Sequence, residues 1–315
     1  MSGLETIVEF GCLSDEQRWN AGRYDFAWLP ELDAHDRGIV KLLDCLADGE
    51  FSGQASSAQL YELMVREVDN GYPRELQYDW AEIYAYANII VYEESRHGFS
   101  LGLLNYYVDT GRTDFIKRLS VREYGRKYVW CYDDRRYWDL YSYILAHLFG
   151  EVVNTELYRD IRAKVHHPEL RQIITNVMTD EARHTRAWAN LIGNLIRSDP
   201  RHEERALKTL TKGLLFHNAM VHETYFEGQN KMLKLFSSAQ GGKAGAIERI
   251  VKIKHNLLDE LFGADKNPLS EAEIKKIHME FLASSFGETR AVAGPNGTIK
   301  FLKQEEDAPV LAEAV

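Results

Sequence analysis

The chain has 315 residues, 45% of them hydrophobic, so it is long enough to bury a large core. Its formal net charge of -10 argues against binding to nucleic acid, because a polyanion would be repelled. The three cysteines lie far apart with no paired spacing, which indicates a reducing, cytoplasmic environment. We see no signal peptide and no apolar run long enough to cross a bilayer, so we expect no contact with a membrane.

Helical periodicity covers most of the sequence. Residues 1–35 have a mixed pattern, and the Gly- and Ser-rich stretch from Gly49 to Ser57 predicts a loop. Apolar residues at helical spacing predict helices over 35–46, 57–68, 75–110, 139–165, 169–197, 202–236, 245–262 and 274–286. The helix over 75–110 is apolar on most sides, which is typical of a central, buried helix.

The C-terminal end has a different pattern. Residues 294–297 read Gly-Pro-Asn-Gly and precede a short apolar stretch, which predicts a β-hairpin. We expect residues 304–315 to be disordered. The sequence therefore predicts an all-α domain over 1–290 with a tail over 291–315.

One motif occurs twice. Residues 93–97 read Glu-Glu-Ser-Arg-His, and residues 180–184 read Asp-Glu-Ala-Arg-His, each within a long predicted helix. Positions i and i+3 share one face of a helix, so Glu94 with His97, and Glu181 with His184, each present a carboxylate and an imidazole to one point. A single Glu-x-x-His match is expected by chance on the order of once in such a chain, whereas two matching copies are a stronger signal. Exposed helix charges are the alternative explanation.

Helical bundles that hold two iron or manganese ions use two Glu-x-x-His motifs and one further Glu from each of two other helices. Glu151 lies in mid-helix between apolar residues and is preferred to Glu156. Glu62 lies among apolar residues and is preferred to Glu67, while Glu50 lies outside the predicted helix and is disfavoured. Carboxylate and imidazole donors suit iron or manganese, and the absence of nearby cysteine argues against structural zinc.

These motifs resemble those of the soluble acyl-carrier-protein desaturases. That family carries Glu-Glu-x-Arg-His-Gly, matched by residues 93–98, followed by a Leu-Leu-Asn…Gly-Arg stretch, matched by residues 103–112. Its Asp-Glu-x-Arg-His motif is matched by residues 180–184, and its Phe-x-Glu by residues 149–151. The resemblance covers residues 93–200, about a third of the chain.

The resemblance implies a homodimeric, ferritin-like di-iron bundle that receives an acyl chain on acyl carrier protein and electrons from a ferredoxin. It implies as metal ligands Glu94, His97, Glu151, Glu181 and His184, to which spacing adds Glu62. The residues expected to support the ligands are Asp180, Arg96, Arg183 and Thr155. The basic segment over 112–136 would contact the carrier through Arg112, Lys117, Arg118, Arg122, Arg126 and Lys127. A solvated helix face is the alternative reading of that segment.

The sequence departs from the family at three points. The family's first ligand lies in a Glu-x-x-Leu-Pro stretch that is missing here. The family's threonine position holds Asn154, and Thr155 follows it, a placement more similar to some di-iron monooxygenases. Related arylamine N-oxygenases carry an extra histidine where this chain has Val177, which argues against that subgroup.

The sequence thus predicts a di-iron oxidase that uses O2 to oxidise an acyl chain, by desaturation or by hydroxylation. A di-iron monooxygenase of a biosynthetic metabolite is the first alternative. A non-catalytic ferritin-like iron-binding protein is the second, although its cage-forming members are usually shorter. A structural bundle with empty motifs is the third. Iron and manganese both remain open as the metal.

Overall fold

The computed structural model describes residues 3–19, 25–51, 53–115, 139–210, 242–285, 289–293 and 299–303. The helices are α1 (Gly3–Glu16), η2 (Phe26–Glu31, a 3-10 helix), α2 (Ala34–Leu42), α3 (Asp44–Phe51), α4 (Gly53–Asp69), α5 (Arg74–Tyr78), α6 (Ala81–Thr110), α9 (Leu140–Lys164), α10 (Pro168–Ser198), α11 (Pro200–Leu210), α13 (Gly242–Phe262) and α14 (Glu271–Ser285). The strands are β1 (Thr289–Ala293) and β2 (Ile299–Lys303).

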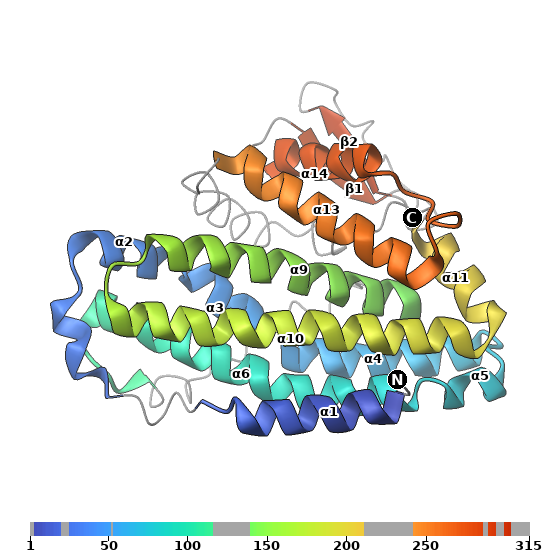
Figure 1. Cartoon of the computed structure of the whole chain (residues 1–315), viewed down its shortest axis with the longest axis horizontal. Helices are drawn as coiled ribbons and strands as arrows, with labels where there is room; N and C mark the ends of the chain where they lie inside the picture. The colour runs from blue at the N-terminus through green and yellow to red at the C-terminus, as the bar shows by residue number, and fades with distance from the viewer. Residues whose placement is uncertain are drawn as a thin grey trace, which may run out of the picture.

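The long helices α6, α9 and α10 run side by side along the molecule (Figure 1). Helices α3 and α4 follow one another behind them, and α1 lies along α6 and α10 on the opposite side from α13 (Figure 1). Helix α13 packs against both α9 and α10, and it is covered in turn by α14 and the two strands. The predicted all-α bundle is therefore confirmed.

Local sequence explains where the central helices begin and end. Helix α6 ends at Gly111, whose φ of 69° is left-handed and whose N–H donates to the carbonyl of Tyr107 at 2.7 Å. Helix α9 begins with a capping box in which the Asp139 carboxylate accepts the Ser142 N–H at 2.7 Å. Helix α10 begins with Pro168 in its first turn, where a missing N–H costs nothing.

The structure corrects the predicted elements in the first third of the chain. Residues 1–35, which had no predicted element, contain α1 and η2. The loop predicted from Gly49 to Ser57 is instead helical, with α3 ending at Phe51 and α4 beginning at Gly53. Two glycines and a serine cluster were interpreted as a break, but packing of this segment against α6 keeps it helical. Glu50 therefore lies on a helix.

The C-terminal hairpin is confirmed. Strands β1 and β2 pair antiparallel, from Thr289 opposite Lys303 to Ala293 opposite Ile299. Both strands contact α14, and β1 crosses the predicted division between residues 290 and 291. The part of the 202–236 helix beyond Leu210 and the tail over 304–315 lie outside the described residues.

Within the described ranges, no helix combines the length and the apolar character needed to cross a membrane. The core fills the space between the long helices with large aromatic side chains, among them Trp80, Tyr86, Trp188 and Tyr158, which are fully buried. Acidic and histidine side chains are buried among them at mid-bundle, although charged groups are rarely buried unless they are paired or bind metal.

Candidate metal centre

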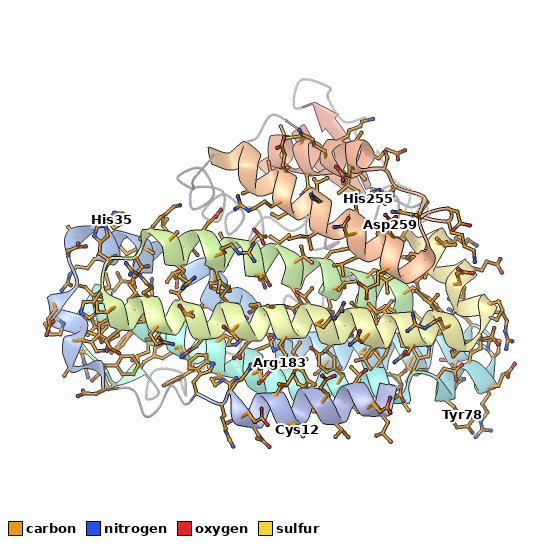
Figure 2. The ribbon with its side chains drawn as sticks, viewed as in Figure 1. Cys12, His35, Tyr78, Arg183, His255 and Asp259 are labelled. Atoms are coloured by element: carbon orange, nitrogen blue, oxygen red, sulfur yellow. The ribbon has the colours of Figure 1, made fainter. Side chains whose placement is uncertain are left out.

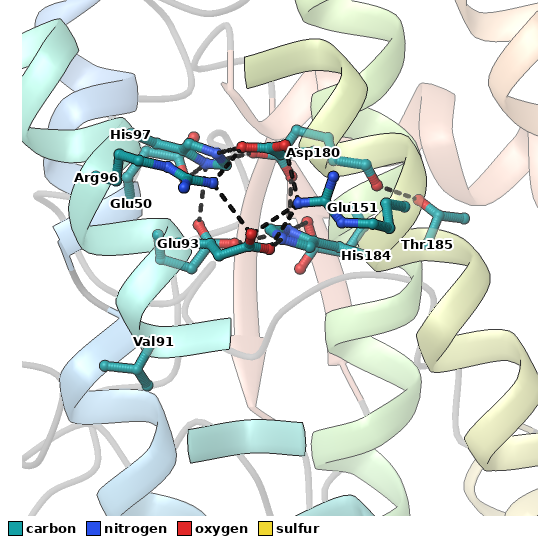
Figure 3. A network of polar contacts seen from close by, with 12 residues as sticks. Glu50, Val91, Glu93, Arg96, His97, Glu151, Asp180, His184 and Thr185 are labelled. Carbon is teal, nitrogen blue, oxygen red and sulfur yellow. Dashed lines mark hydrogen bonds and ion pairs between the residues drawn. The ribbon is translucent and has the colours of Figure 1, made fainter. Parts of the chain in front are cut away.

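Six buried side chains from four helices meet in the middle of the bundle (Figure 3). They form two overlapping groups of four, in each of which the donor atoms lie within 4.8 Å of one another. One group is Glu50, Glu94, His97 and Glu181, and the other is Glu94, Glu151, Glu181 and His184. Glu94 and Glu181 belong to both groups. Each group could therefore hold one metal ion, and the two groups share two carboxylates.

Each histidine turns its Nδ1 toward the carboxylates of the cluster. The His97 Nδ1 lies 3.2 Å from Glu181 Oε1 and 3.5 Å from Glu50 Oε2. The His184 Nδ1 lies 2.9 Å from Glu94 Oε1. Both rings are fully buried, so neither nitrogen can rely on water as its partner.

The opposite ring nitrogens are held by two further acids. The His97 Nε2 lies 3.0 Å from Asp180 Oδ2, and the His184 Nε2 lies 2.8 Å from Glu93 Oε2. A carboxylate that accepts the Nε2 proton fixes the tautomer and leaves a lone pair on Nδ1. This is the pattern by which proteins orient metal-binding histidines.

The pairing is crossed between the two motifs. Glu93, from the α6 motif, holds the histidine of α10, while Asp180, from the α10 motif, holds the histidine of α6 (Figure 3). The two arginines bind the same acids: Arg96 donates to Asp180 at 2.8 Å, and Arg183 donates to Glu93 at 2.7 Å. The recurring Asp/Glu-Glu-x-Arg-His sequence thus builds one interlocked network.

Helix α1 and the residues after it cover this network. The Ser14 hydroxyl donates to Glu93 Oε1 at 2.5 Å, and the Trp19 indole N–H donates to Asp180 Oδ2 at 2.8 Å. Arg183, which Figure 2 shows between α10 and α1, donates to the Gln17 side chain at 2.8 Å. The Trp19 ring also lies parallel to His97, with their centroids 6.0 Å apart. The α1 segment therefore shields the acids that orient the histidines.

Several ligand atoms are buried without any hydrogen-bond partner. They are Glu94 Oε1, both carboxylate oxygens of Glu181, and the Nδ1 atoms of His97 and His184. Burying such atoms unpaired is costly, and native proteins rarely tolerate it without a reason. Metal ions between these atoms would satisfy them all, so the residues present fit a dinuclear metal centre.

The protonation state of the metal-free cluster also fits a metal centre. Burial and the neighbouring carboxylates Glu181 and Glu94 raise the pKa of Glu50 and of Glu151 well above the usual value. Burial opposes protonation of His97, but the nearby carboxylates of Asp180 and Glu181 raise its pKa well above the usual value. Without metal the cluster therefore retains protons, which bound cations would displace.

The donor types and charges suit two divalent ions. The four carboxylates, once ionised, balance two doubly charged cations, and the outer acids Glu93 and Asp180 are balanced by Arg96 and Arg183. Oxygen donors with one imidazole at each position favour iron or manganese, and no thiolate from the described residues joins the cluster.

Glu62, which was predicted as a ligand, does not join the cluster. Glu62 is exposed on α4, and Glu50 lies in the cluster in its place. The alternative, Glu67, forms an ion pair with Arg205 at 2.8 Å. Glu50 was disfavoured because its segment was predicted to be a loop, whereas it is the last turn of α3. The five other predicted ligands come together as expected.

The predicted supporting residues behave differently from one another. Asp180, Arg96 and Arg183 lie in the network described above. The Thr155 hydroxyl instead donates to the backbone carbonyl of Glu151 at 2.8 Å. Glu93 was not predicted as a supporting residue, although it could have been found because it holds the position of Asp180 in the repeat.

The predicted carrier-binding segment lies almost entirely beyond the part of the chain that the structure describes. Arg112 is exposed and pairs with Asp114 at 2.5 Å. Outside the described residues lie Lys117, Arg118, Arg122, Arg126 and Lys127. Its role as a docking surface stays a prediction.

The geometry therefore brings together two overlapping, buried groups of carboxylate and imidazole donors that could each hold a metal ion, with each histidine oriented by an acid from the other motif. In comparisons with known proteins, no family model, no curated protein and no solved structure matches the chain.

Proposed function

We propose that this protein is an O2-dependent, non-haem di-iron oxidase. The observation that carries the proposal is the pair of four-donor groups that share Glu94 and Glu181 at the centre of the bundle. Glu50 and His97 would hold one metal, Glu151 and His184 would hold the other, and Glu94 and Glu181, which belong to both groups, would take part in both. When bound, two ferrous ions would supply the electrons that activate O2, and O2 is the oxidant that removes hydrogen from an unactivated C–H bond.

The chain's own residues would exclude water and hold the ligands in place. Glu181, His97 and His184 are fully buried, and large aromatic side chains pack beside them: Tyr86 lies edge-on to Trp188, with centroids 4.8 Å apart. A dry, rigid surrounding protects an oxidising centre from side reactions. Arg96 and Arg183 keep the outer acids ionised, so that these acids go on accepting the Nε2 protons of the histidines.

The substrate class rests on the resemblance to acyl-carrier-protein desaturases. We propose an acyl chain delivered on acyl carrier protein, with a ferredoxin-type protein as electron donor, in a cytoplasmic homodimer. The acidic carrier would bind the basic segment over 112–136. Hydroxylation by a di-iron monooxygenase is the alternative outcome, and the position of Thr155 after Asn154 is the feature that favours it.

The test is to load the reduced protein with ferrous iron and incubate it with acyl-carrier-protein thioesters of different lengths, a reduced ferredoxin and O2. Mass spectrometry of the acyl chain should show a loss of 2 Da for desaturation or a gain of 16 Da for hydroxylation. Failure of every thioester to react would remove the acyl substrate from the proposal. Less than one iron per two chains after loading would overturn the oxidase itself.

A matched pair of variants separates the centre from general folding effects. Glu181→Ala removes a group shared by both metal positions, and we expect it to lose both irons and all product. Glu156→Gln alters a carboxylate that is equally buried but pairs with Arg159 and Arg249 away from the cluster. That variant should keep its iron and its product.

A further inference from the structure

The two metal positions differ in what holds their terminal carboxylates. Tyr158, on α9, is fully buried, and its hydroxyl donates to Glu50 Oε1 at 2.5 Å. With that oxygen engaged, the other oxygen of Glu50 is the one that faces the cluster, where Glu50 Oε2 lies 3.5 Å from His97 Nδ1. Glu50 thus presents a single oxygen in a fixed direction.

Within the described residues, Glu151 lacks a hydrogen bond equivalent to the one from Tyr158 to Glu50. Among the described residues, no side chain outside the cluster donates a hydrogen bond to its carboxylate, and the Thr155 hydroxyl reaches only its backbone carbonyl. The charged groups that act on the Glu151 carboxylate are members of the cluster itself, namely Glu181, Glu94 and His184. Its two oxygens are therefore free to change how they bind a metal.

Solvent exposure follows the same division. The Glu94 and Glu151 side chains are 12% and 7% exposed, whereas the Glu50 side chain is 3% exposed and both histidine rings are fully buried. Of the two carboxylates that belong to one group only, Glu151 is therefore the more exposed and Glu50 the less exposed.

We infer that the two positions are functionally unequal: Tyr158 is a positioning residue that fixes Glu50 at the first metal, and exogenous ligands bind at the second, beside Glu151 and His184. This inference rests on the proposed dinuclear centre. At the first position the hydrogen bond from Tyr158 stops Glu50 from binding through both oxygens, so that coordination there is constant. At the second position Glu151 can move aside to admit a ligand.

The test uses Co2+, whose visible spectrum reports coordination geometry, added to the metal-free protein. We expect wild type to bind two ions per chain. Tyr158→Phe removes only the hydroxyl, and loss of such an outer hydrogen bond typically weakens metal binding about 10- to 100-fold. The weaker affinity should be seen in only one of the two Co2+-binding steps. The matched control is Tyr86→Phe, because Tyr86 is equally buried and its hydroxyl contacts a backbone carbonyl, that of His184, at 3.4 Å.

Single-position backgrounds identify the step that is affected. In Glu151→Ala, where only the Glu50 position remains complete, adding Tyr158→Phe should weaken Co2+ binding and change its spectrum. In Glu50→Ala, adding Tyr158→Phe should change neither. Azide, used as the probe ligand, should alter the Co2+ spectrum of Glu50→Ala and leave that of Glu151→Ala unchanged.

The possible failures are distinct. If Tyr158→Phe binds Co2+ as Tyr86→Phe does, or if azide alters the spectrum of Glu151→Ala, the inequality is refuted while the dinuclear centre stands. If wild type takes up no Co2+, the proposed function fails, and this inference fails with it. Far-UV circular dichroism of each variant before metal addition identifies any loss of the helical fold. Small changes in stability do not affect the azide test, because it compares the Co2+ spectra of one variant with and without azide.

Discussion

Within the described part of the chain, two buried histidine networks differ in whether both ring nitrogens have a hydrogen-bond partner. Near α5 and α11, the fully buried His202 has both ring nitrogens bonded: Nδ1 to the Tyr141 hydroxyl at 2.8 Å and Nε2 to Asp79 at 3.0 Å. At mid-bundle, His97 and His184 have only Nε2 bonded, and their Nδ1 atoms have no hydrogen-bond partner. Burial is the same in both networks, so an unsatisfied donor atom is the informative feature.

A third group shows the same rule at the surface. His35, Asp36 and His166 lie close enough to hold an ion. Both oxygens of the Asp36 carboxylate, however, already accept the backbone N–H groups of His166 and His167. The rings of His35 and His166 are stacked 4.4 Å apart, so their in-plane lone pairs do not meet at one point. Proximity alone therefore does not indicate a metal site here.

The largest expected effect comes from removing one histidine from each buried network. His184→Ala should lose the metal at its position, and oxidation should fall to background. His202→Ala should keep two metals per chain and lose about 2–4 kcal/mol of unfolding free energy, because it leaves a cavity and unpaired Tyr141 and Asp79 groups. Metal analysis measures the metal bound to each variant, and urea denaturation measures its unfolding free energy. Loss of metal from His202→Ala with its fold intact would contradict the division between the two networks.

Metal binding itself should also stabilise the fold. An ion that binds only the folded state at a hundred times its Kd contributes about 2.7 kcal/mol, so two sites contribute roughly 5 kcal/mol. We expect this gain when Mn2+ is added to wild type or to His202→Ala, as measured by denaturation with and without a chelator. His184→Ala should gain at most half as much. An equal gain in all three proteins would locate the stabilising ions elsewhere.

The smallest expected effect concerns the outer acids. Burial alone would raise the pKa of Glu93, but the His184 hydrogen bond, the charges of His184 and Arg183 and the Ser14 hydroxyl lower it to about 2. A lowered carboxylate pKa stabilises the fold above the unfolded value of about 4.5, and that stability is lost as the pH falls toward 2. Glu93→Gln should therefore be less stable than wild type by about 3 kcal/mol at neutral pH.

That difference should close as acid protonates Glu93 in wild type. Denaturation of the metal-free proteins between pH 2 and pH 7 measures it, with Glu169→Gln as a control on the exposed first turn of α10. A difference that stays constant across this range would mean that Glu93 contributes through its shape and packing and that its charge has no part.

The central helices were predictable because each carries a strong local signal. Gly111 and Pro168 mark helix ends, and the two repeated motifs place four of the six cluster residues on faces that can meet. The antiparallel pair of β1 and β2 was likewise predicted from the Gly-Pro-Asn-Gly sequence that lies between the two strands.

The first third of the chain was less predictable because tertiary packing decides it. Glycine and serine near residue 50 locally favour a loop, whereas contact with α6 keeps α3 helical and brings Glu50 into the cluster. Tyr158 and Trp19 could not be assigned from sequence, since their roles depend on partners 108 and 161 residues away. Neither belongs to a motif, and aromatic residues are common in any core.

The crossed hydrogen bonds between the motifs have a consequence for assembly and for engineering. Because the acid of one motif orients the imidazole of the other, a single Glu-x-x-His segment transplanted into another bundle would carry a ligand pair without the group that aims it. The smallest transferable unit is therefore the pair of helical segments around Glu93 and Asp180, packed together as they are here. Metal uptake by a designed or truncated version would report that both helices have found their native register.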